Sequence, residues 1–134
     1  MVNSNQLGTK QFLYLDDLHV GQRFISDTRL IDEDEIKAFG KQFDPQPFHL
    51  DADTAKETLF EGLVASGWHT AAISMRVLVD GVPIAGGIVG VGGEIEWPKP
   101  TRPGDVLHVE SEIVELRPSR WWLAQQCRRV KMRA

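Results

Sequence analysis

Cysteine is nearly absent from this sequence, since Cys127 is the only one among 134 residues. A single thiol cannot form a disulfide within the chain, and it cannot build a metal site from several thiolates. Long apolar runs are also missing, because no stretch approaches the roughly 20 residues that a membrane-spanning helix needs. Residues 1–10 lack the basic start and apolar core of a secretory signal. We therefore expect a cytoplasmic protein with no membrane span.

Positive charge is scarce over most of the chain. Residues 1–116 carry nine basic and nineteen acidic side chains, whereas residues 117–134 carry six basic side chains and no acidic one. Because phosphate binding needs a positive field, the acidic body weighs against nucleic acid as a partner. A chain of 134 residues with 42% hydrophobic and 25% charged residues is typical of one globular domain.

The most distinctive stretch is FDPQPFHLD at residues 43–51, where Asp44 and His49 lie five positions apart across two prolines. Each proline fixes its own φ at about −65° and disfavours the α conformation for the preceding residue, so Asp44 and Gln46 should be extended and the loop stiff. A carboxylate and an imidazole held toward one cavity can divide a proton transfer between them. We interpret this pair as a candidate active site. The alternative is an ordinary Asp-Pro turn in which a backbone carbonyl satisfies His49.

Hydrophobic periodicity and capping residues predict the elements around this stretch. The expected elements are a strand at 21–30, a helix capped by Asp32, a short helix capped by Asp51 or Asp53, a long apolar helix within 63–80, and two mutually paired strands at 88–97 and 106–116. Residues 121–127 fit either a strand or a helix. Gly40 should weaken the first helix near its end. At the start of the long helix, Ser66 offers a capping hydroxyl, and Gly67 lets another group approach its backbone closely.

Three sequence blocks then point to a family. They are Asp44-x-x-Pro47-x-His49-x-Asp51, Val64-Ala65-Ser66-Gly67-Trp68 and Trp97-x-x-Pro100-x-x-x-Gly104-Asp105. Their combination and order resemble the MaoC-like dehydratases, which include the (R)-specific enoyl-CoA hydratases. The resemblance covers residues 16–120, and we accordingly divide the chain into a flexible N-terminus at 1–11, a MaoC-like domain at 12–120 and a basic tail at 121–134. This tail is shorter than, and divergent from, the end of the family's domain.

The resemblance implies an α+β hotdog fold, in which a curved antiparallel sheet wraps a central helix, here residues 66–80. It also implies a homodimer and an acyl-CoA or related acyl-thioester substrate, with neither a metal nor a further cofactor. Carried over by position, Asp44 and His49 match the family's catalytic acid and histidine. The backbone N–H of Gly67 matches the group that faces the thioester carbonyl. The remaining candidates for the substrate pocket are Gln46, Pro47, Ser66 and Trp68.

Two departures from the family pattern bear on the substrate. Gln46 stands where the family often has Asn, and Ser66 stands where it often has His. Hydration of a 2-enoyl thioester is the favoured reaction, because an acid and a histidine lie on one short loop. Thioester hydrolysis and non-catalytic acyl binding remain the alternatives, since hotdog folds serve several functions. Two further possibilities are a metal held by Asp44, His49, Asp51 and Asp53, and contacts of Lys99, Arg102 and Arg120 with CoA phosphates.

Overall fold

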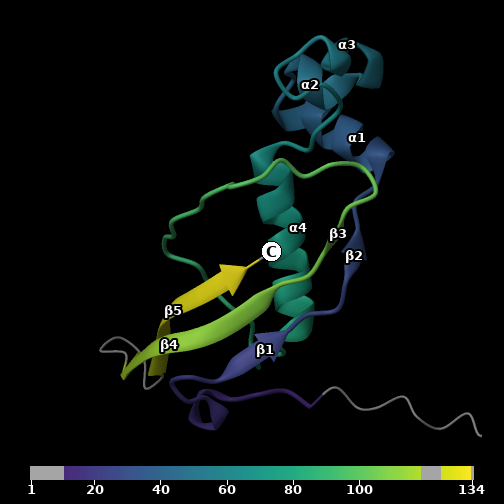
Figure 1. Ribbon diagram of the computed structural model, residues 1–134. Helices are drawn as coiled ribbons and strands as arrows, with labels where there is room; N and C mark the ends of the chain where they lie inside the picture. Colours follow the sequence, from purple (N-terminus) through teal and green to yellow (C-terminus); the bar gives the residue numbers. More distant parts are fainter. Residues whose placement is uncertain (1–10, 119–124, 134) are drawn as a thin grey trace, which may run out of the picture.

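The structure, a computed structural model, describes the backbone of residues 11–118 and 125–133 and the side chains up to residue 117 (Figure 1). In chain order the elements are the 3-10 helix η1 (Leu15–Asp17), β1 (Arg23–Ile25), β2 (Arg29–Leu30), α1 (Glu33–Phe43), α2 (Pro47–Leu50), α3 (Ala52–Lys56), α4 (Gly67–Gly81), β3 (Val106–Leu107), β4 (Glu110–Pro118) and β5 (Gln125–Arg133). Helix α4 lies at the centre, with α1, α2 and α3 gathered beyond its first turn (Figure 1).

The strands form two antiparallel sheets. One has the order β1-β4-β5, and the other pairs β2 with β3. In the first sheet Arg23 lies opposite Glu112, and β5, which includes part of the undecided segment 121–127, pairs with β4 along its whole length. Residues 119–124 lie outside the described part of the chain. The undecided segment therefore resolves, where it is described, as a strand.

The predicted strand at 21–30 is in fact two short strands, and the predicted strand at 106–116 is divided between the two-residue β3 and the nine-residue β4. The cause is a side chain between them. The Ser26 hydroxyl accepts the backbone N–H of Val109 at 2.8 Å and donates to the carbonyl of Asp27 at 2.8 Å. It thus takes a backbone donor that a regular ladder would pair with a carbonyl, and the strands divide at this point.

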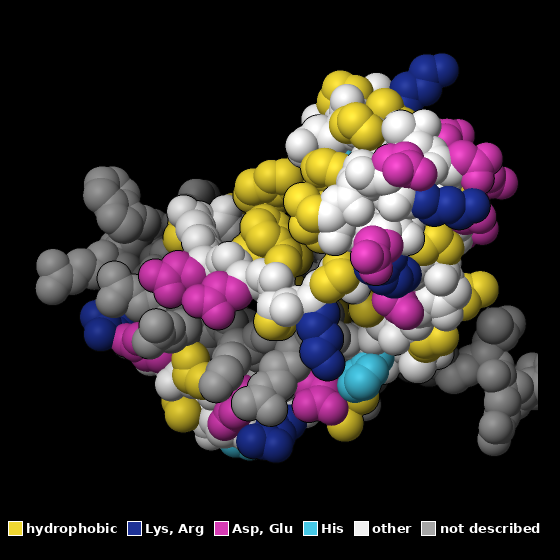
Figure 2. Space-filling view, turned by 45° about the horizontal axis from the view of Figure 1, so that its top comes forward, with side chains coloured by type: hydrophobic (Ala, Val, Ile, Leu, Met, Phe, Trp, Pro, Cys, Tyr) yellow, Lys and Arg dark blue, Asp and Glu magenta, His cyan; other side chains and the backbone are white. Residues whose placement is uncertain are grey.

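The predicted strand at 88–97 is absent, and the expectation that it pairs with residues 106–116 is wrong. Strand β4 already has β1 on one side and β5 on the other, so neither edge is open to a further strand. The segment is instead exposed and has no regular secondary structure, and the side chain of Val91 is fully accessible. Hydrophobic side chains gather into a surface patch beside the helical end of the molecule (Figure 2).

Helix α1 begins as predicted, because the Asp32 carboxylate accepts the backbone N–H of Glu35 at 3.1 Å. Its buried Ile36 packs in a cluster with Ile31, Ala55, Leu63, Ala65 and Ile73. The short helix α3 is capped by Asp51, whose carboxylate accepts the N–H of Thr54 at 2.8 Å. Among the described residues, no helix is long and apolar enough to cross a bilayer.

His69 lies buried on α4 and stacks on Phe39 of α1, with ring centroids 4.8 Å apart. Its Nδ1 atom is buried without a hydrogen-bond partner in the structure. Burial lowers the pKa of His69, against a smaller opposing effect of the Glu35 carboxylate, and Arg29 lowers it further. The folded protein therefore favours the neutral imidazole, which packs between the two helices.

We expect this histidine to make stability depend on pH. The unfolded chain takes up the proton near pH 6.5 while the folded chain resists it, so the free energy of unfolding should fall as the pH drops below about 6.5. The variant His69→Phe should lose that part of the pH dependence, whereas His19→Gln, at an exposed position, should keep it. Urea unfolding between pH 5 and 8 measures the free energy of unfolding of each variant. If this free energy changed equally with pH in the wild type and in His69→Phe, His69 would not be the source of the pH dependence.

Candidate active site

Asp44 lies where α1 ends. Its backbone N–H donates to the carbonyl of Gly40 at 2.9 Å, and Pro45 prevents the helix from continuing. Gln46 is extended, with φ −96° and ψ 148°, as the following proline predicts. Pro47 then opens α2 in the first turn, a position that proline tolerates because the N–H it lacks has no helical acceptor. Two prolines thus place His49 on a separate short helix directly after Asp44.

Gly40 allows these two helices to touch. A Cβ atom at this position would lie 2.7 Å from the carbonyl oxygen of His49 and 2.9 Å from its Cβ, closer than such atoms approach. The missing side chain therefore lets the backbone of α1 pack directly on His49. The sequence indicated only a weakened helix at Gly40, because the contact joins residues whose approach depends on the fold.

The Asp44 carboxylate and the His49 imidazole face each other. The distance from Asp44 Oδ2 to His49 Nε2 is 3.2 Å. Two more side chains hold the carboxylate: the Gln46 amide donates to Oδ1 at 2.7 Å and the Ser66 hydroxyl donates to Oδ2 at 2.7 Å. The candidate pair is therefore brought together by the fold, with both carboxylate oxygens fixed.

His49 also meets the condition of the alternative interpretation, since Nδ1 lies 2.7 Å from the carbonyl oxygen of Val64. A carbonyl can only accept, so Nδ1 carries the hydrogen. This bond fixes the ring orientation and leaves Nε2 as the atom directed at Asp44. The backbone contact and the acid–imidazole contact therefore exist together, and the first supports the second.

The hydrogen bonds of Asp44 set its charge. Donation from Gln46, and then from Ser66, lowers the pKa of the Asp44 carboxyl; partial burial opposes this, and the neighbouring His49 adds to the lowering. Asp44 is therefore a carboxylate at neutral pH, with two fixed donors and one imidazole around it. Such a group can accept a proton from a molecule that binds beside it.

Gly67 is the first residue of α4, so its N–H has no acceptor within the helix. Ser66 holds the N-cap position, yet its hydroxyl makes no capping bond and goes to Asp44 instead. The expectation that Ser66 caps the helix is therefore wrong. The Trp97 indole lies against Gly67, where a Cβ atom would come within 2.8 Å of the ring. The missing side chain of Gly67 therefore lets the Trp97 ring pack directly on the start of α4.

These groups border one cavity of about 430 Å³. Its lining consists of Asp44, Gln46, Phe48, His49, Leu59, Phe60, Val64, Ala65, Gly67, Thr70, Trp97, Pro98, Lys99, Pro100 and Thr101. Of the four predicted pocket residues, only Gln46 is part of this lining, and Ser66 contacts the lining through its hydrogen bond to Asp44. Pro47 shapes the loop at the start of α2, and Trp68 is 63% exposed and packs edge-on against Trp97 at 5.6 Å. The cavity therefore has the Asp44 carboxylate and His49 on one part of its wall, and the rest of the wall is largely apolar.

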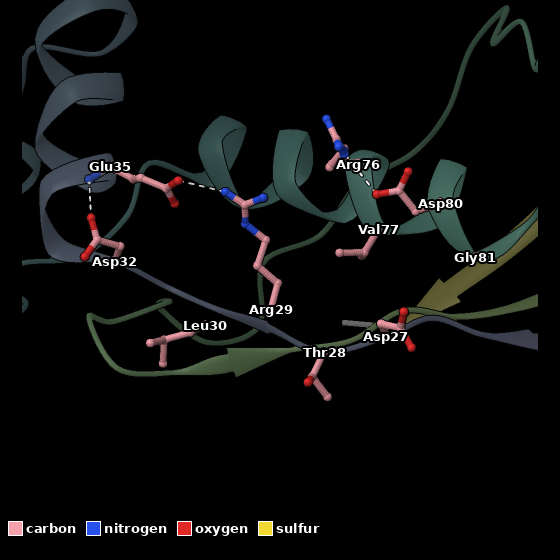
Figure 3. A pocket seen from close by; sticks show the side chains of 10 residues that line it. All are labelled: Asp27, Thr28, Arg29, Leu30, Asp32, Glu35, Arg76, Val77, Asp80 and Gly81. Atoms are coloured by element: carbon pink, nitrogen blue, oxygen red, sulfur yellow. Dashed lines mark hydrogen bonds and ion pairs between the residues drawn. The ribbon is translucent and has the colours of Figure 1, made fainter. Parts of the chain in front are cut away.

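A second cavity, of about 450 Å³, lies between β2 and α4 (Figure 3). Its charged side chains are engaged with each other: Arg29 binds Glu35 at 2.8 Å and Arg76 binds Asp80 at 2.9 Å. The charges of these lining side chains are therefore neutralised by each other. The lining of this second cavity includes neither Asp44 nor His49. The cavity beside Gly67 is therefore the candidate active site.

The remaining cations lie in different places. Lys99 lines the candidate site at an exposed position, whereas the Arg102 guanidinium donates to the carbonyl of Phe60 at 2.7 Å and so supports the cavity wall. Arg120 lies outside the described residues. Within the described part of the chain, no group of three or more His, Cys, Asp or Glu side chains is placed to hold a metal ion.

Comparison with known proteins agrees with this architecture. The model of the MaoC like domain matches residues 18–129. The crystal structure of a MaoC-like dehydratase from Rhodospirillum rubrum is 55% identical, covers 83% of this chain and 77% of its own, and superposes with a TM-score of 0.78. R-hydratase PhaJ1 from Pseudomonas aeruginosa is 30% identical over 78% of this chain and 67% of its own, with a TM-score of 0.68.

A 3-hydroxybutyryl-CoA dehydratase from Methylorubrum extorquens is 32% identical over 108 residues, which are 81% of this chain and 68% of that protein. A central helix with antiparallel strands, and an acid–imidazole pair beside the start of that helix, thus define an α+β domain with the hotdog fold. The chain belongs to the MaoC-like domain family. The family and fold expected from the three sequence blocks are confirmed.

Gly40 allows a test of the packing under the acid–imidazole pair. By helix propensity alone, Gly40→Ala should stabilise the protein by roughly 0.5–1 kcal/mol. The contact with His49 predicts the opposite sign, because overpacking typically costs about 1–3 kcal/mol. We expect net destabilisation in urea unfolding. The matched variant Gly90→Ala, with open space around its Cβ, should change little, and a stabilised Gly40→Ala would contradict the packing described.

Proposed function

We propose that the protein adds water to, or removes it from, the double bond of a 2-enoyl thioester. The observation that carries this proposal is the 3.2 Å contact of Asp44 Oδ2 with His49 Nε2, in a cavity whose lining also includes Gly67, the first residue of α4. Family membership supports the same reaction class, because the matched relatives include a 3-hydroxybutyryl-CoA dehydratase and an R-hydratase.

The pair supplies the proton transfers. Nδ1 of His49 donates its hydrogen to the Val64 carbonyl, so Nε2 is the ring atom that faces the Asp44 carboxylate. A water molecule bound beside the pair can donate a hydrogen to the Asp44 carboxylate and exchange a proton with Nε2 of His49. The water oxygen then bonds to the β carbon of the substrate while the pair takes one of its protons. A proton returned from the pair to the α carbon completes the addition, and elimination follows the reverse course.

The start of α4 supplies the charge stabilisation. As the water oxygen attacks, the electron pair of the double bond moves toward the α carbon and the thioester oxygen becomes negative. The N–H of Gly67 lies at the positive end of a 15-residue helix, which favours an anion there. Because Ser66 does not cap this end, the N–H groups of the first turn have no capping side chain that would compete with a substrate oxygen.

We further propose an acyl-CoA substrate and a homodimer. Lys99 is an exposed cation in the cavity lining and suits the phosphates of coenzyme A. Several apolar side chains of α4 and of the segment after it are exposed: Trp68, Met75, Val79, Val89, Val91 and Ile95. Large exposed apolar side chains are often found at interaction surfaces, and a second copy of the chain is the proposed partner.

Incubation with a short 2-enoyl-CoA tests the reaction. We expect loss of the enoyl absorbance without release of thiol. Asp44→Asn keeps the shape of the side chain but removes its charge, so turnover should fall by about 10² to 10⁴-fold. Asp53→Asn, an exposed residue on α3, is the matched control and should stay active. Thiol release would indicate hydrolysis instead, and binding with neither change would indicate a non-catalytic acyl-binding domain.

Ser66→Ala tests the role of the hydroxyl that holds Asp44. This donor lowers the pKa of the Asp44 carboxyl, so its removal should raise that pKa. The proton acceptor must be ionised to act, and the acidic limb of kcat/KM should therefore move to higher pH. Ser74→Ala also removes a hydroxyl from α4, one that donates to the Thr70 carbonyl, and should leave the limb in place. An unshifted limb in Ser66→Ala would remove Ser66 from the control of Asp44.

A further inference from the structure

Two threonine hydroxyls meet inside the candidate active site without an evident structural need. Thr70 on α4 and Thr101 after Pro100 both line the cavity, and their Oγ1 atoms lie 3.1 Å apart. The walls near them are mostly apolar, formed by Phe48, Leu59, Phe60, Val64, Ala65, Pro98 and Pro100. A valine has the shape of a threonine, so an apolar pair could fill the same space without burying polar atoms.

The hydroxyl pair is not required to hold the two segments together. The backbone N–H of Ala65 already donates to the carbonyl of Thr101 at 2.8 Å, which ties the chain before α4 to the segment around Thr101. This main-chain bond would remain if either hydroxyl were removed. The polar pair therefore calls for another explanation.

The hydrogen-bonding capacity of the pair is only partly used. Thr70 Oγ1 lies 3.4 Å from the Ser66 carbonyl, which already accepts the Thr70 N–H at 3.0 Å, so the Thr101 oxygen is the better acceptor. When Thr70 donates to Thr101, the hydroxyl hydrogen of Thr101 is not used in that bond and can be donated to another group. The pair can then offer one hydrogen, and lone pairs, to a bound molecule.

The position of the pair indicates which part of a substrate it meets. Coenzyme A is far larger than a cavity of about 430 Å³, so the CoA part of a bound substrate must extend out of the cavity at its exposed side, where Leu59 and Lys99 lie. The acyl end therefore occupies the inner part, where Thr70 is only 8% exposed. Thr70 follows Gly67 by three residues on the same helix, a rise of about 4.5 Å.

We propose that Thr70 and Thr101 bind an oxygen on the fourth carbon of the acyl chain, counted from the thioester carbonyl. Three carbon–carbon bonds of about 1.5 Å each span roughly 4 Å, which is comparable to the rise of about 4.5 Å along the helix axis between the backbone positions of Gly67 and Thr70. The preferred substrate is then a short 2-enoyl thioester that carries a hydroxyl or carboxylate oxygen at this carbon. The inference rests on the proposed function, because it places the thioester oxygen at Gly67.

Binding of saturated analogues tests the inference apart from catalysis, because a substrate without a double bond cannot be hydrated. Calorimetry should give a Kd for 4-hydroxybutyryl-CoA about five- to tenfold below that for butyryl-CoA, the gain expected of one additional buried hydrogen bond. Thr101→Val and Thr70→Val should remove this preference while butyryl-CoA binds as before or better. Ser74→Ala, one turn further along α4, should keep it.

The wild-type ratio alone can overturn the proposal, so it does not depend on the variants folding. Equal affinity for the two analogues, tighter binding of butyryl-CoA, or binding of neither would each reject it. A preference that survives in both valine variants would assign the oxygen to another part of the cavity and would also reject it. Loss of hydration in a protein that keeps the binding preference would instead reject the proposed reaction and leave this subsite in place.

Discussion

Direct contact between the backbone of α1 and His49 is the constraint on which the site depends. Gly40 has no side chain, so α1 lies within van der Waals contact of α2 at His49. His49 is then buried with Nδ1 bound to the Val64 carbonyl, and its ring has one remaining direction for Nε2. Asp44 lies at that position because it is the C-cap of α1, which Pro45 prevents from continuing. Packing, one hydrogen bond and one proline thus fix the 3.2 Å distance together.

Ser66 shows how the site departs from a local rule of helix structure. A serine at the N-cap commonly binds the N–H of the second or third helical residue and stabilises the helix by about 1 kcal/mol. Here the hydroxyl donates to Asp44, and α4 begins without a side-chain cap. The helix gives up that stabilisation, and the N–H groups of its first turn stay available to a negative oxygen. By donating to Asp44, the Ser66 hydroxyl fixes the carboxylate and at the same time leaves the start of α4 uncapped. Departures from the usual capping preference are expected at functional sites.

The helices and the acid–imidazole pair could be predicted from sequence because their causes are local. Asp32 and Asp51 cap helices within three residues of themselves, and Pro45 and Pro47 restrict their immediate neighbours. The close packing at Gly40 could not be predicted in this way. It depends on a neighbour nine residues away that comes near only when α2 folds back on α1.

The strands were harder to predict for a related reason. Alternation shows that a segment can form a strand, but pairing requires an open edge elsewhere in the chain. Residues 106–116 have the expected character, yet the Ser26 side chain divides them from a distance of about eighty positions in sequence. Residues 88–97 have β-branched side chains, but β1 and β5 occupy both edges of β4. Local sequence contains neither fact.

The absence of the strand at 88–97 leaves the cavity intact, because a different interaction places its wall. Trp97, the last residue of that segment, packs on Gly67. Four residues later, the Thr101 carbonyl accepts the N–H of Ala65. These contacts hold residues 97–101 to the start of α4 independently of any ladder. The segment before Trp97 can therefore remain exposed while the indole, the threonine pair and the Gly67 amide keep their positions. The geometry of the candidate site is thus anchored to the start of the central helix rather than to the completeness of the sheet.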